Sequence, residues 1–316
     1  HVVNSKLDDA IDKMVWAVAR HSARFNDGKE FKPRGYITDY YTEEAIKVIE
    51  NNRHRPFFLY MSHWAVHNPL QALKNDYEYL SHIKNHNLRV YSAMISALDR
   101  SVGQIVDALK INKLEENTLV IFTSDNGGAA YIELSDINKP FRGWKLNHFE
   151  GGIHVPFIMK WPINLVAGSS FEKAIHHNDI FSTIVSAVKA DMPSDRLIDG
   201  VDLLPYLMGL GEGDPHETLF WKEGHHQTVL NKHWKLIRSE RPNKRWLFNL
   251  KTDPTETENL VDSEKEILKN LEALLDQHVI EQAKPLWPSV VDSPQLIDKH
   301  GGESYEEGDE YIYWPN

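Results

Sequence analysis

Residues 119–128 read Leu119-Val120-Ile121-Phe122-Thr123-Ser124-Asp125-Asn126-Gly127-Gly128. The four apolar residues that open this stretch predict a short strand buried on both faces. Ligands bind beyond the carboxyl ends of strands in open α/β sheets, so the polar turn that follows is a candidate site. Asp125 and Asn126 carry the hard oxygens that Ca²⁺ or Mg²⁺ prefers, and the glycines allow a sharp turn beside them. A plain Asx turn after a strand is the structural alternative.

The same order of helix and buried strand recurs on both sides of this stretch. Apolar residues at helical spacing predict helices at residues 7–25, 42–49, 91–109 and 180–188. Short apolar runs predict further buried strands at residues 57–61 and 155–159. Helices that alternate with continuously apolar strands are typical of a parallel sheet covered on both faces. The sequence therefore predicts an α/β fold with a mixed, mostly parallel sheet flanked by helices.

The pattern changes after about residue 209. Short alternating segments around residues 228–230, 234–237 and 246–249 predict a small antiparallel sheet, and residues 264–278 have the apolar spacing of one helix. We therefore expect residues 1–209 to be part of a catalytic α/β domain and 210–316 to form a small C-terminal subdomain and tail. We expect Trp287 and Trp314 to anchor that tail.

Composition excludes several classes of protein. The chain has 316 residues, 41% of them hydrophobic and 26% charged, which is ordinary for a globular protein. Its net charge of -11 argues against a broad nucleic-acid surface, and no apolar run has the length of a membrane helix. Zero cysteines exclude disulfides, thiolate metal sites and a cysteine nucleophile within these residues.

A second candidate site follows the strand expected at residues 57–61, where the chain reads Ser62-His63-Trp64-Ala65-Val66-His67-Asn68-Pro69. His67 could donate a proton or bind an oxyanion, because imidazole titrates near neutral pH. His63 is the competing candidate, and either histidine could instead have a purely structural role.

A third candidate site is the loop that reads Arg142-Gly143-Trp144-Lys145-Leu146-Asn147-His148-Phe149-Glu150-Gly151-Gly152. Lys145 could present an ammonium to a sulfate or phosphate, and Arg142 could do so with a bidentate fork. Solvated surface charge is the alternative for both. The adjacent pair His225 and His226 is interpreted as structural or peripheral, because neighbours on a strand point to opposite faces.

Taken in order, these segments resemble the formylglycine-dependent (type I) sulfatase family of the alkaline phosphatase superfamily. The similarity extends from about residue 35 to residue 260 in one collinear order. The segments that carry it are Val66-His67-Asn68-Pro69, Ser124-Asp125-Asn126-Gly127-Gly128, Arg142-Gly143-Trp144-Lys145, Glu150-Gly151-Gly152, Asp199-Gly200-Val201-Asp202 and Leu247-Phe248-Asn249-Leu250.

The resemblance implies an alkaline-phosphatase-like α/β fold and a role for each matching residue. It implies that Asp125 and Asn126 bind a divalent cation, usually Ca²⁺, with Mg²⁺ as an alternative. Lys145 is expected to contact the sulfate and its leaving oxygen, and His67 to stabilise or protonate the leaving group. We also expect Arg142 and His148 to bind substrate.

The chain departs from the family pattern in one respect. The family nucleophile, a formylglycine made in a Cys/Ser-x-Pro-x-Arg motif, has no counterpart here, because there is no cysteine and no serine in that pattern. Asp125 and Asn126 also cannot fill a Ca²⁺ shell of six to eight ligands. We therefore expect an amino-terminal segment of the same protein to supply the nucleophile and the other ligands, and this chain alone to be inactive.

Two other functions remain possible at this stage. A phosphoester or phosphonate hydrolase of the same superfamily would use the same groups, although Asn126 favours the less highly charged sulfate. A non-catalytic binding or structural relative is the other. On family grounds we expect a sulfated small molecule or carbohydrate as substrate, no nucleic-acid or membrane partner, and a periplasmic or secreted location. The oligomeric state is left open.

Overall fold

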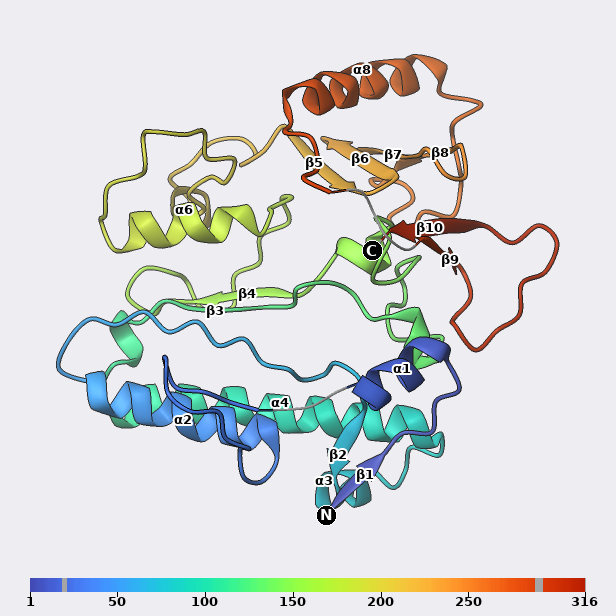
Figure 1. The fold of residues 1–316 in the computed structure, drawn as a ribbon. Helices are drawn as coiled ribbons and strands as arrows, with labels where there is room; N and C mark the ends of the chain where they lie inside the picture. The colour runs from blue at the N-terminus through green and yellow to red at the C-terminus, as the bar shows by residue number, and fades with distance from the viewer. Residues whose placement is uncertain (19–21, 288–291, 316) are drawn as a thin grey trace. The chain divides into compact units, whose positions relative to one another are not determined.

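The computed structural model describes residues 1–18, 22–287 and 292–315, which form two compact units (Figure 1). The first unit contains residues 1–118 together with the short segments 131–134 and 300–302, and the second contains the rest. The boundary expected near residue 209 falls inside the second unit and stays a prediction.

The first unit is mainly helical. Its elements are β1 (Val2–Asn4), α1 (Ala10–Val18), α2 (Ile37–Asn52), β2 (Gln71–Leu73), α3 (Lys74–Tyr79), α4 (His86–Ile111) and the 3₁₀ helix η1 (Glu115–Asn117). Helix α4 begins where the Asn85 side chain accepts a hydrogen bond from the Leu88 amide (2.9 Å), which satisfies one of the free donors of the first turn. One face of α4 packs against α2, where Thr42 and Ser101 form a buried hydrogen bond.

The second unit contains the remaining elements. They are β3 (Val120–Thr123), α5 (Glu150–Ile153), β4 (Phe157–Lys160), α6 (Asn178–Ala187), α7 (Leu204–Leu207), β5 (Thr218–Glu223), β6 (His226–Asn231), β7 (Trp234–Ser239), β8 (Lys244–Asn249), α8 (Lys265–Glu281), β9 (Asp292–Leu296) and β10 (Tyr311–Pro315). The short helix η2 (Ala130–Ile132) spans the boundary between the units.

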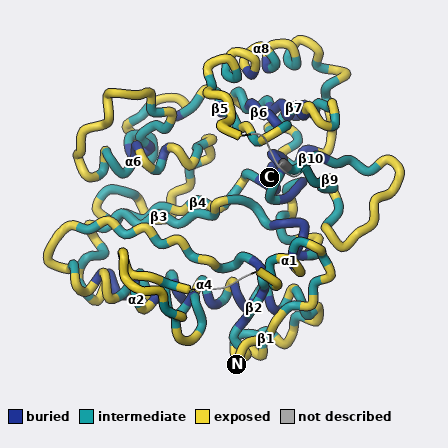
Figure 2. The backbone as a smooth tube through the Cα atoms, viewed as in Figure 1, coloured by how far each residue is buried: buried dark blue, intermediate teal, exposed yellow. Residues whose placement is uncertain are grey.

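Strands β5, β6, β7 and β8 form an antiparallel sheet in that order, as the alternating segments predict. Leu236 and Leu247 face helix α8 and pack against Leu271 and Leu275. Their strand neighbours face the other way, into a cluster composed of Phe149, Ile237, Trp246, Phe248, Ile297 and Ile312. The sheet therefore separates helix α8 from the loop that contains Phe149, and Figure 2 shows buried positions concentrated on β6 and β7.

The strand expected at residues 57–61 is not formed. Within the described residues this segment has no ladder partner, and Phe58 and Tyr60 are 72% and 80% exposed. An apolar run forms a buried strand only when neighbouring strands satisfy its backbone and cover both faces, and here alternate side chains lie in solvent. The strands expected around residues 120 and 157 are present as β3 and β4, and they pair antiparallel. Every ladder among the described residues is antiparallel, so the mostly parallel pairing expected from the sequence is not seen in them.

The tail is held by strand pairing and by two buried isoleucines. Strands β9 and β10 form an antiparallel hairpin, and Ile297 and Ile312 of this segment are fully buried. Trp287 is 72% exposed, while Trp314 is half-buried in strand β10. Ile297 and Ile312 anchor the tail because they reach the core beneath the sheet. Among the described residues, no helix combines the length and apolar character needed to cross a membrane.

Candidate functional site

The turn after β3 presents Asp125 and Asn126 where the sequence predicts them. Asp125 is exposed and accepts a hydrogen bond from the Asn126 amide (3.0 Å). The Asn126 side-chain nitrogen donates to the Gly127 carbonyl (2.9 Å), and the Ser124 hydroxyl donates to the Asn126 carbonyl (2.9 Å). These bonds give the turn a defined backbone path, with one carboxylate and one amide projecting from it.

The lysine loop, residues 142–152, packs backbone to backbone against this turn. The Lys145 amide donates to the Gly128 carbonyl (2.9 Å), and the Gly127 amide donates to the Gly152 carbonyl (2.9 Å). A Cβ at Gly127 would lie 1.8 Å from the Gly151 carbonyl oxygen, so no other residue fits there. The structure thus brings the backbone of Lys145 against the turn that carries Asp125 and Asn126, about 20 residues earlier in the sequence.

Asn138 joins the turn to the lysine loop. Its side-chain oxygen accepts from the Gly128 amide (2.8 Å), and its nitrogen donates to the carbonyls of Gly128 (2.9 Å) and Gly143 (3.0 Å). Sequence reasoning missed this residue because a lone asparagine in a polar loop carries no local sign of partners on both sides.

A buried ionic network supports the far end of the lysine loop. The Lys235 ammonium is fully buried and lies 2.7 Å from a Glu150 carboxylate oxygen and 2.8 Å from a Glu256 carboxylate oxygen. Burial raises the pKa of Glu150, but the Lys235 charge and hydrogen bonds from His154 and Lys235 outweigh it and lower that pKa to about 2. Burial raises the pKa of Glu256, against the Lys235 charge. The network connects α5 to strand β7, and it was not predicted from the sequence.

His148 is buried rather than open to a ligand. It is 6% exposed, its Nδ1 lies 2.9 Å from the Thr228 hydroxyl, and its ring packs edge-on against His226. Burial, with the charges of His226 and Lys235, lowers the pKa of His148 to about 3, so the ring is neutral near pH 7. The contact of His148 with substrate stays a prediction, and its observed partner is strand β6.

The two adjacent histidines of the hairpin between β5 and β6 separate as expected for strand neighbours. His226 is 2% exposed and lies beside His148, and burial followed by the charge of His225 lowers its pKa to about 4. His225 instead pairs with Asp292 (3.3 Å). Near them, Glu223 lies 3.9 Å from His148, and burial raises its pKa while Lys145 opposes that rise. A carboxylate near Lys145 was not predicted from the sequence.

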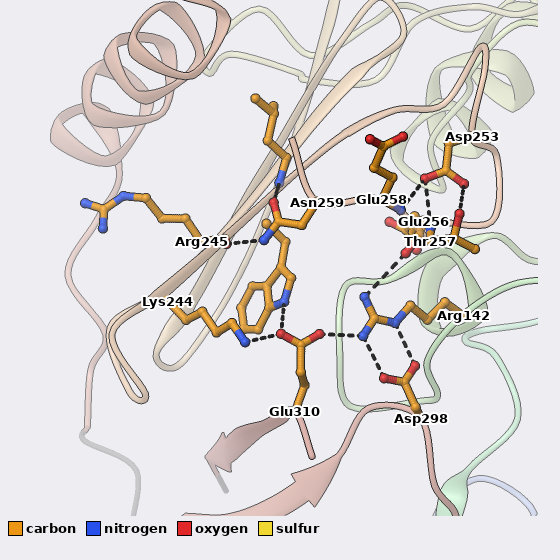
Figure 3. A network of polar contacts seen from close by, with 12 residues as sticks. Arg142, Lys244, Arg245, Asp253, Glu256, Thr257, Glu258, Asn259, Asp298 and Glu310 are labelled. Atoms are coloured by element: carbon orange, nitrogen blue, oxygen red, sulfur yellow. Dashed lines mark hydrogen bonds and ion pairs between the residues drawn. The ribbon is translucent and has the colours of Figure 1, made fainter. Parts of the chain in front are cut away.

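Arg142 is engaged by two carboxylates (Figure 3). Its Nε and one terminal nitrogen donate to both oxygens of Asp298 (2.6 Å each), and the same terminal nitrogen donates to Glu310 (2.6 Å). The guanidinium also lies over the Phe149 ring, 4.9 Å from its centroid. Burial lowers the pKa of Arg142, but Asp298 and Glu310 reverse this and raise it above its usual range. The substrate contact expected of Arg142 stays a prediction, and the structure shows an internal fork-to-fork ion pair.

The candidate histidines of residues 62–69 belong to the first unit. The His67 Nδ1 donates to the Asn68 carbonyl (2.7 Å), and the ring packs against Trp64. His63 lies against Tyr41 and within 3.3 Å of the Ser101 hydroxyl, and burial lowers its pKa. His63 is therefore a packing residue, and the placement of His67 at the site with Lys145 stays a prediction.

Comparison with known protein families shows which family the chain belongs to. The family model described as Sulfatase matches residues 8–190, more than half of the chain, and these residues include the turn and the lysine loop. The chain belongs to the sulfatase family. A second family model, described as N-sulphoglucosamine sulphohydrolase, C-terminal, matches residues 143–284 of this sulfatase.

Individual relatives agree with this assignment. The uncharacterized sulfatase YdeN of Escherichia coli (strain K12) is 28% identical over 315 residues, covering 85% of this chain and 56% of YdeN. Human steryl-sulfatase is 36% identical over 198 residues, covering 60% of this chain and 33% of that enzyme. The crystal structure of Ps i-CgsB superposes with a TM-score of 0.76 at 29% identity, covering 83% of this chain and 59% of that chain. The sulfatase chain therefore spans about half the length of these relatives, or less, and its expected α/β class is confirmed.

The oxygen atoms of the turn are of the chemical type that binds a hard divalent cation. Asp125 and Asn126 project side-chain oxygens from one turn, and such oxygens suit Ca²⁺ or Mg²⁺. Within the described part of the chain, no group of three histidine or acidic side chains could hold a metal ion. Asp125 and Asn126 would therefore hold a cation only together with further ligands.

Proposed function

We propose that the protein containing this chain hydrolyses sulfate esters, with Asp125, Asn126 and Lys145 forming one wall of the sulfate site. The observation that carries this proposal is the direct backbone packing of the turn against the lysine loop, through the bond from Lys145 to Gly128. This packing holds the backbone of Lys145 against the turn that carries Asp125 and Asn126, which supports a site made of a lysine and a bound cation. Such a combination neutralises the charge that grows on a sulfuryl group in the transition state.

Each residue has a distinct role in this proposal. The Lys145 ammonium donates hydrogen bonds to the sulfate and to the leaving oxygen, which lowers the barrier to departure of that oxygen. His67 gives a proton to the leaving alkoxide through Nε2. Asp125 and Asn126 would hold a divalent cation, preferably Ca²⁺, which when bound supplies further positive charge to the sulfate oxygens.

We infer that the nucleophile and the remaining cation ligands come from sequence outside residues 1–316. The nucleophile of the family is a formylglycine, and the chain has no residue in the motif that yields it. The isolated chain is accordingly expected to show no turnover.

A sulfated carbohydrate is the proposed substrate class. One solved form of Ps i-CgsB is described as a complex with k-i-k-neocarrahexaose, and a canine relative that is 36% identical over 177 residues is named N-acetylgalactosamine-6-sulfatase. Glu223, near Lys145, could accept hydrogen bonds from sugar hydroxyls. A periplasmic or secreted location belongs to the same proposal.

The proposal is tested by replacing Lys145 in the full-length protein. Lys145→Ala should lower kcat/KM for an aryl sulfate by about 10³-fold, since the lost charge acts mainly in the transition state. The matched control is Lys139→Ala, which removes an exposed lysine of the neighbouring segment paired only with Asp136 in the contacts described. A control rate within about twofold of the parent is expected, because exposed ion pairs contribute little. Equal rates in both variants would contradict the proposed role.

A phosphoester or phosphonate hydrolase is the main alternative, because a cation and a lysine also serve phosphoryl transfer. The amide of Asn126 in place of a second carboxylate favours the less highly charged sulfate. Parallel assays of the full-length protein with aryl sulfate and aryl phosphate separate the two activities. Hydrolysis of neither ester would support a non-catalytic relative.

A further inference from the structure

The C-terminal hairpin, residues 292–315, has both of its strands, β9 and β10, in the second unit, where they lie against the lysine loop (Figure 1). Both family models end before it, at residues 190 and 284. The hairpin is therefore an element that the family assignment does not explain, although it contacts the segment that carries Lys145.

Gln295 of strand β9 makes the most direct contact. Its side-chain nitrogen donates to the Lys145 carbonyl (3.2 Å), and its oxygen accepts from the Asn147 side chain (3.4 Å). The Asn147 oxygen in turn accepts from the backbone amides of Trp144 and Phe149 (3.3 Å each). Gln295 thus forms hydrogen bonds both to the backbone of Lys145 and to Asn147, whose side chain accepts from two backbone amides of the loop.

Acidic residues of the hairpin fix the start of the loop. Arg142 lies between Asp298 and Glu310, which come from opposite sides of the hairpin (Figure 3). Glu310 also accepts from the Trp246 indole (3.2 Å) and pairs with Lys244, so it connects the loop to strand β8. Because Arg142 and Glu310 are partly withdrawn from water, this network resists screening better than a surface ion pair does.

Apolar contacts complete the attachment. Ile297 and Ile312 are buried in one cluster with Phe149, which lies four residues after Lys145. The hairpin therefore supplies part of the core beneath the loop. Without Ile297 and Ile312, Phe149 would lose packing partners on that side.

The loop needs such support because its backbone is strained beside Lys145. Leu146 has φ of 80°, in the left-handed region that a branched side chain rarely adopts. A residue stays in that region only when its surroundings over-determine its conformation. The hairpin contributes bonds on both sides of Leu146, to the Lys145 carbonyl and to the Asn147 side chain.

We propose that the C-terminal hairpin is a positioning clamp that fixes the Lys145 backbone, with Gln295 as its central positioning residue and Asp298 and Glu310 holding the base of the loop through Arg142. The catalytic consequence rests on the proposed function, whereas the clamp itself does not. Gln295 acts through Lys145 and does not contact the reacting atoms.

The clamp is tested first without any substrate, by amide hydrogen exchange of the full-length protein. Gln295→Ala should speed exchange in residues 143–152 by about fivefold to tenfold, and Asp298→Asn by about tenfold or more, because each removes bonds that hold the loop closed. The matched control is Lys299→Ala, which breaks the hairpin's own ion pairs with Glu306 and Asp309. Exchange in residues 143–152 should change by less than about twofold in that control.

A second measurement separates positioning from general destabilisation. Gln295→Ala should lower kcat for an aryl sulfate by about tenfold with KM little changed, since a displaced lysine loses its geometry with the transition state. In a Lys145→Ala background the same replacement should lower the residual kcat by less than about twofold, because the group being positioned is gone.

Two results would overturn the clamp. One is unchanged exchange of residues 143–152 in both Gln295→Ala and Asp298→Asn. The other is an equal loss of kcat with and without Lys145. A full-length protein that hydrolyses no sulfate ester would contradict the proposed function, while the exchange measurement would still decide the clamp.

Discussion

At the scale of single residues, burial and pairing divide the polar groups into those that can act on a ligand and those that support the site. Asp125 projects from an exposed turn, whereas Arg142 has its guanidinium committed to Asp298 and Glu310. Sequence alone could not separate these cases. A basic residue in a glycine-containing loop looks the same whether its partner is an anionic ligand or a carboxylate 156 residues away.

The buried pair His148 and His226 makes stability depend on pH. Both side chains are neutral in the folded chain, with pKa values of about 3 and about 4, against an ordinary value of 6.5. Protonation therefore favours the unfolded chain, so the stabilisation is present above pH 6.5 and is lost as pH falls toward 4. When pH falls from 7 to 5, the unfolding free energy of the His226→Gln variant should fall by about 1–2 kcal/mol less than that of the parent. Urea denaturation at both pH values measures the difference.

The control for this prediction is His82→Gln, because His82 is exposed. Its pH dependence should match that of the parent. Carboxylates that titrate in the same range change the unfolding free energy of variant and parent equally, so their effect cancels in the comparison. Glu150, with a pKa of about 2, affects the unfolding free energy only below pH 4.5. A His226→Gln variant with the parent's slope would show that the folded chain binds protons there after all.

At the scale of elements, pattern predicted the parts whose burial is decided locally. The run at residues 119–122 marks β3, alternation marks the sheet of β5 to β8, and leucines at helical spacing mark α8. The run at residues 57–61 is equally apolar but forms no strand, because strand formation depends on partners that the run does not encode. The hairpin of β9 and β10 was missed for a related reason, since its anchors are two isolated isoleucines.

The Lys235 network is predicted to be the main ionic support of the lysine loop. Lys235→Met should lower the unfolding free energy by about 3–5 kcal/mol at pH 7, because it leaves Glu150 and Glu256 buried without their cation. Unpaired buried carboxylates have raised pKa values, so their protonated forms fit the fold and the deficit should shrink as pH falls from 7 to 5. Urea denaturation at both pH values measures it.

Lys222→Met is the matched control, since Lys222 lies exposed on strand β5 of the same sheet. It should change stability by less than about 0.5 kcal/mol. A Lys235→Met deficit that is equally small, or that grows on acidification, would mean that the network contributes no net ionic support.

At the scale of the whole molecule, each unit has its own buried positions, and the Sulfatase match extends over parts of both. The turn with Asp125 and Asn126 lies entirely in the second unit, as does the lysine loop that packs against it. Among the described residues, the side chains proposed to bind a cation are therefore those of Asp125 and Asn126 in this turn. Sequence motifs place Asp125 and Asn126 directly after β3, which the structure confirms, and their role as cation ligands stays a prediction.

The incomplete shell leads to a prediction about metal and activity together. Two oxygens from Asp125 and Asn126 leave most of a Ca²⁺ shell of about six to eight ligands unfilled, so the isolated 316-residue chain should bind the ion only weakly. Millimolar Ca²⁺ should raise its unfolding temperature by less than about 1 °C, and aryl sulfate turnover should be absent.

The full-length protein should lose both activity and several degrees of thermal stability on chelation, and regain them with Ca²⁺. Asp125→Asn in that protein should weaken the response, because it removes the one carboxylate of the turn. Circular dichroism serves to show that the isolated chain is folded in the assay. Saturable stabilisation of the isolated chain by Ca²⁺, or turnover by it, would show that residues 1–316 complete the site themselves.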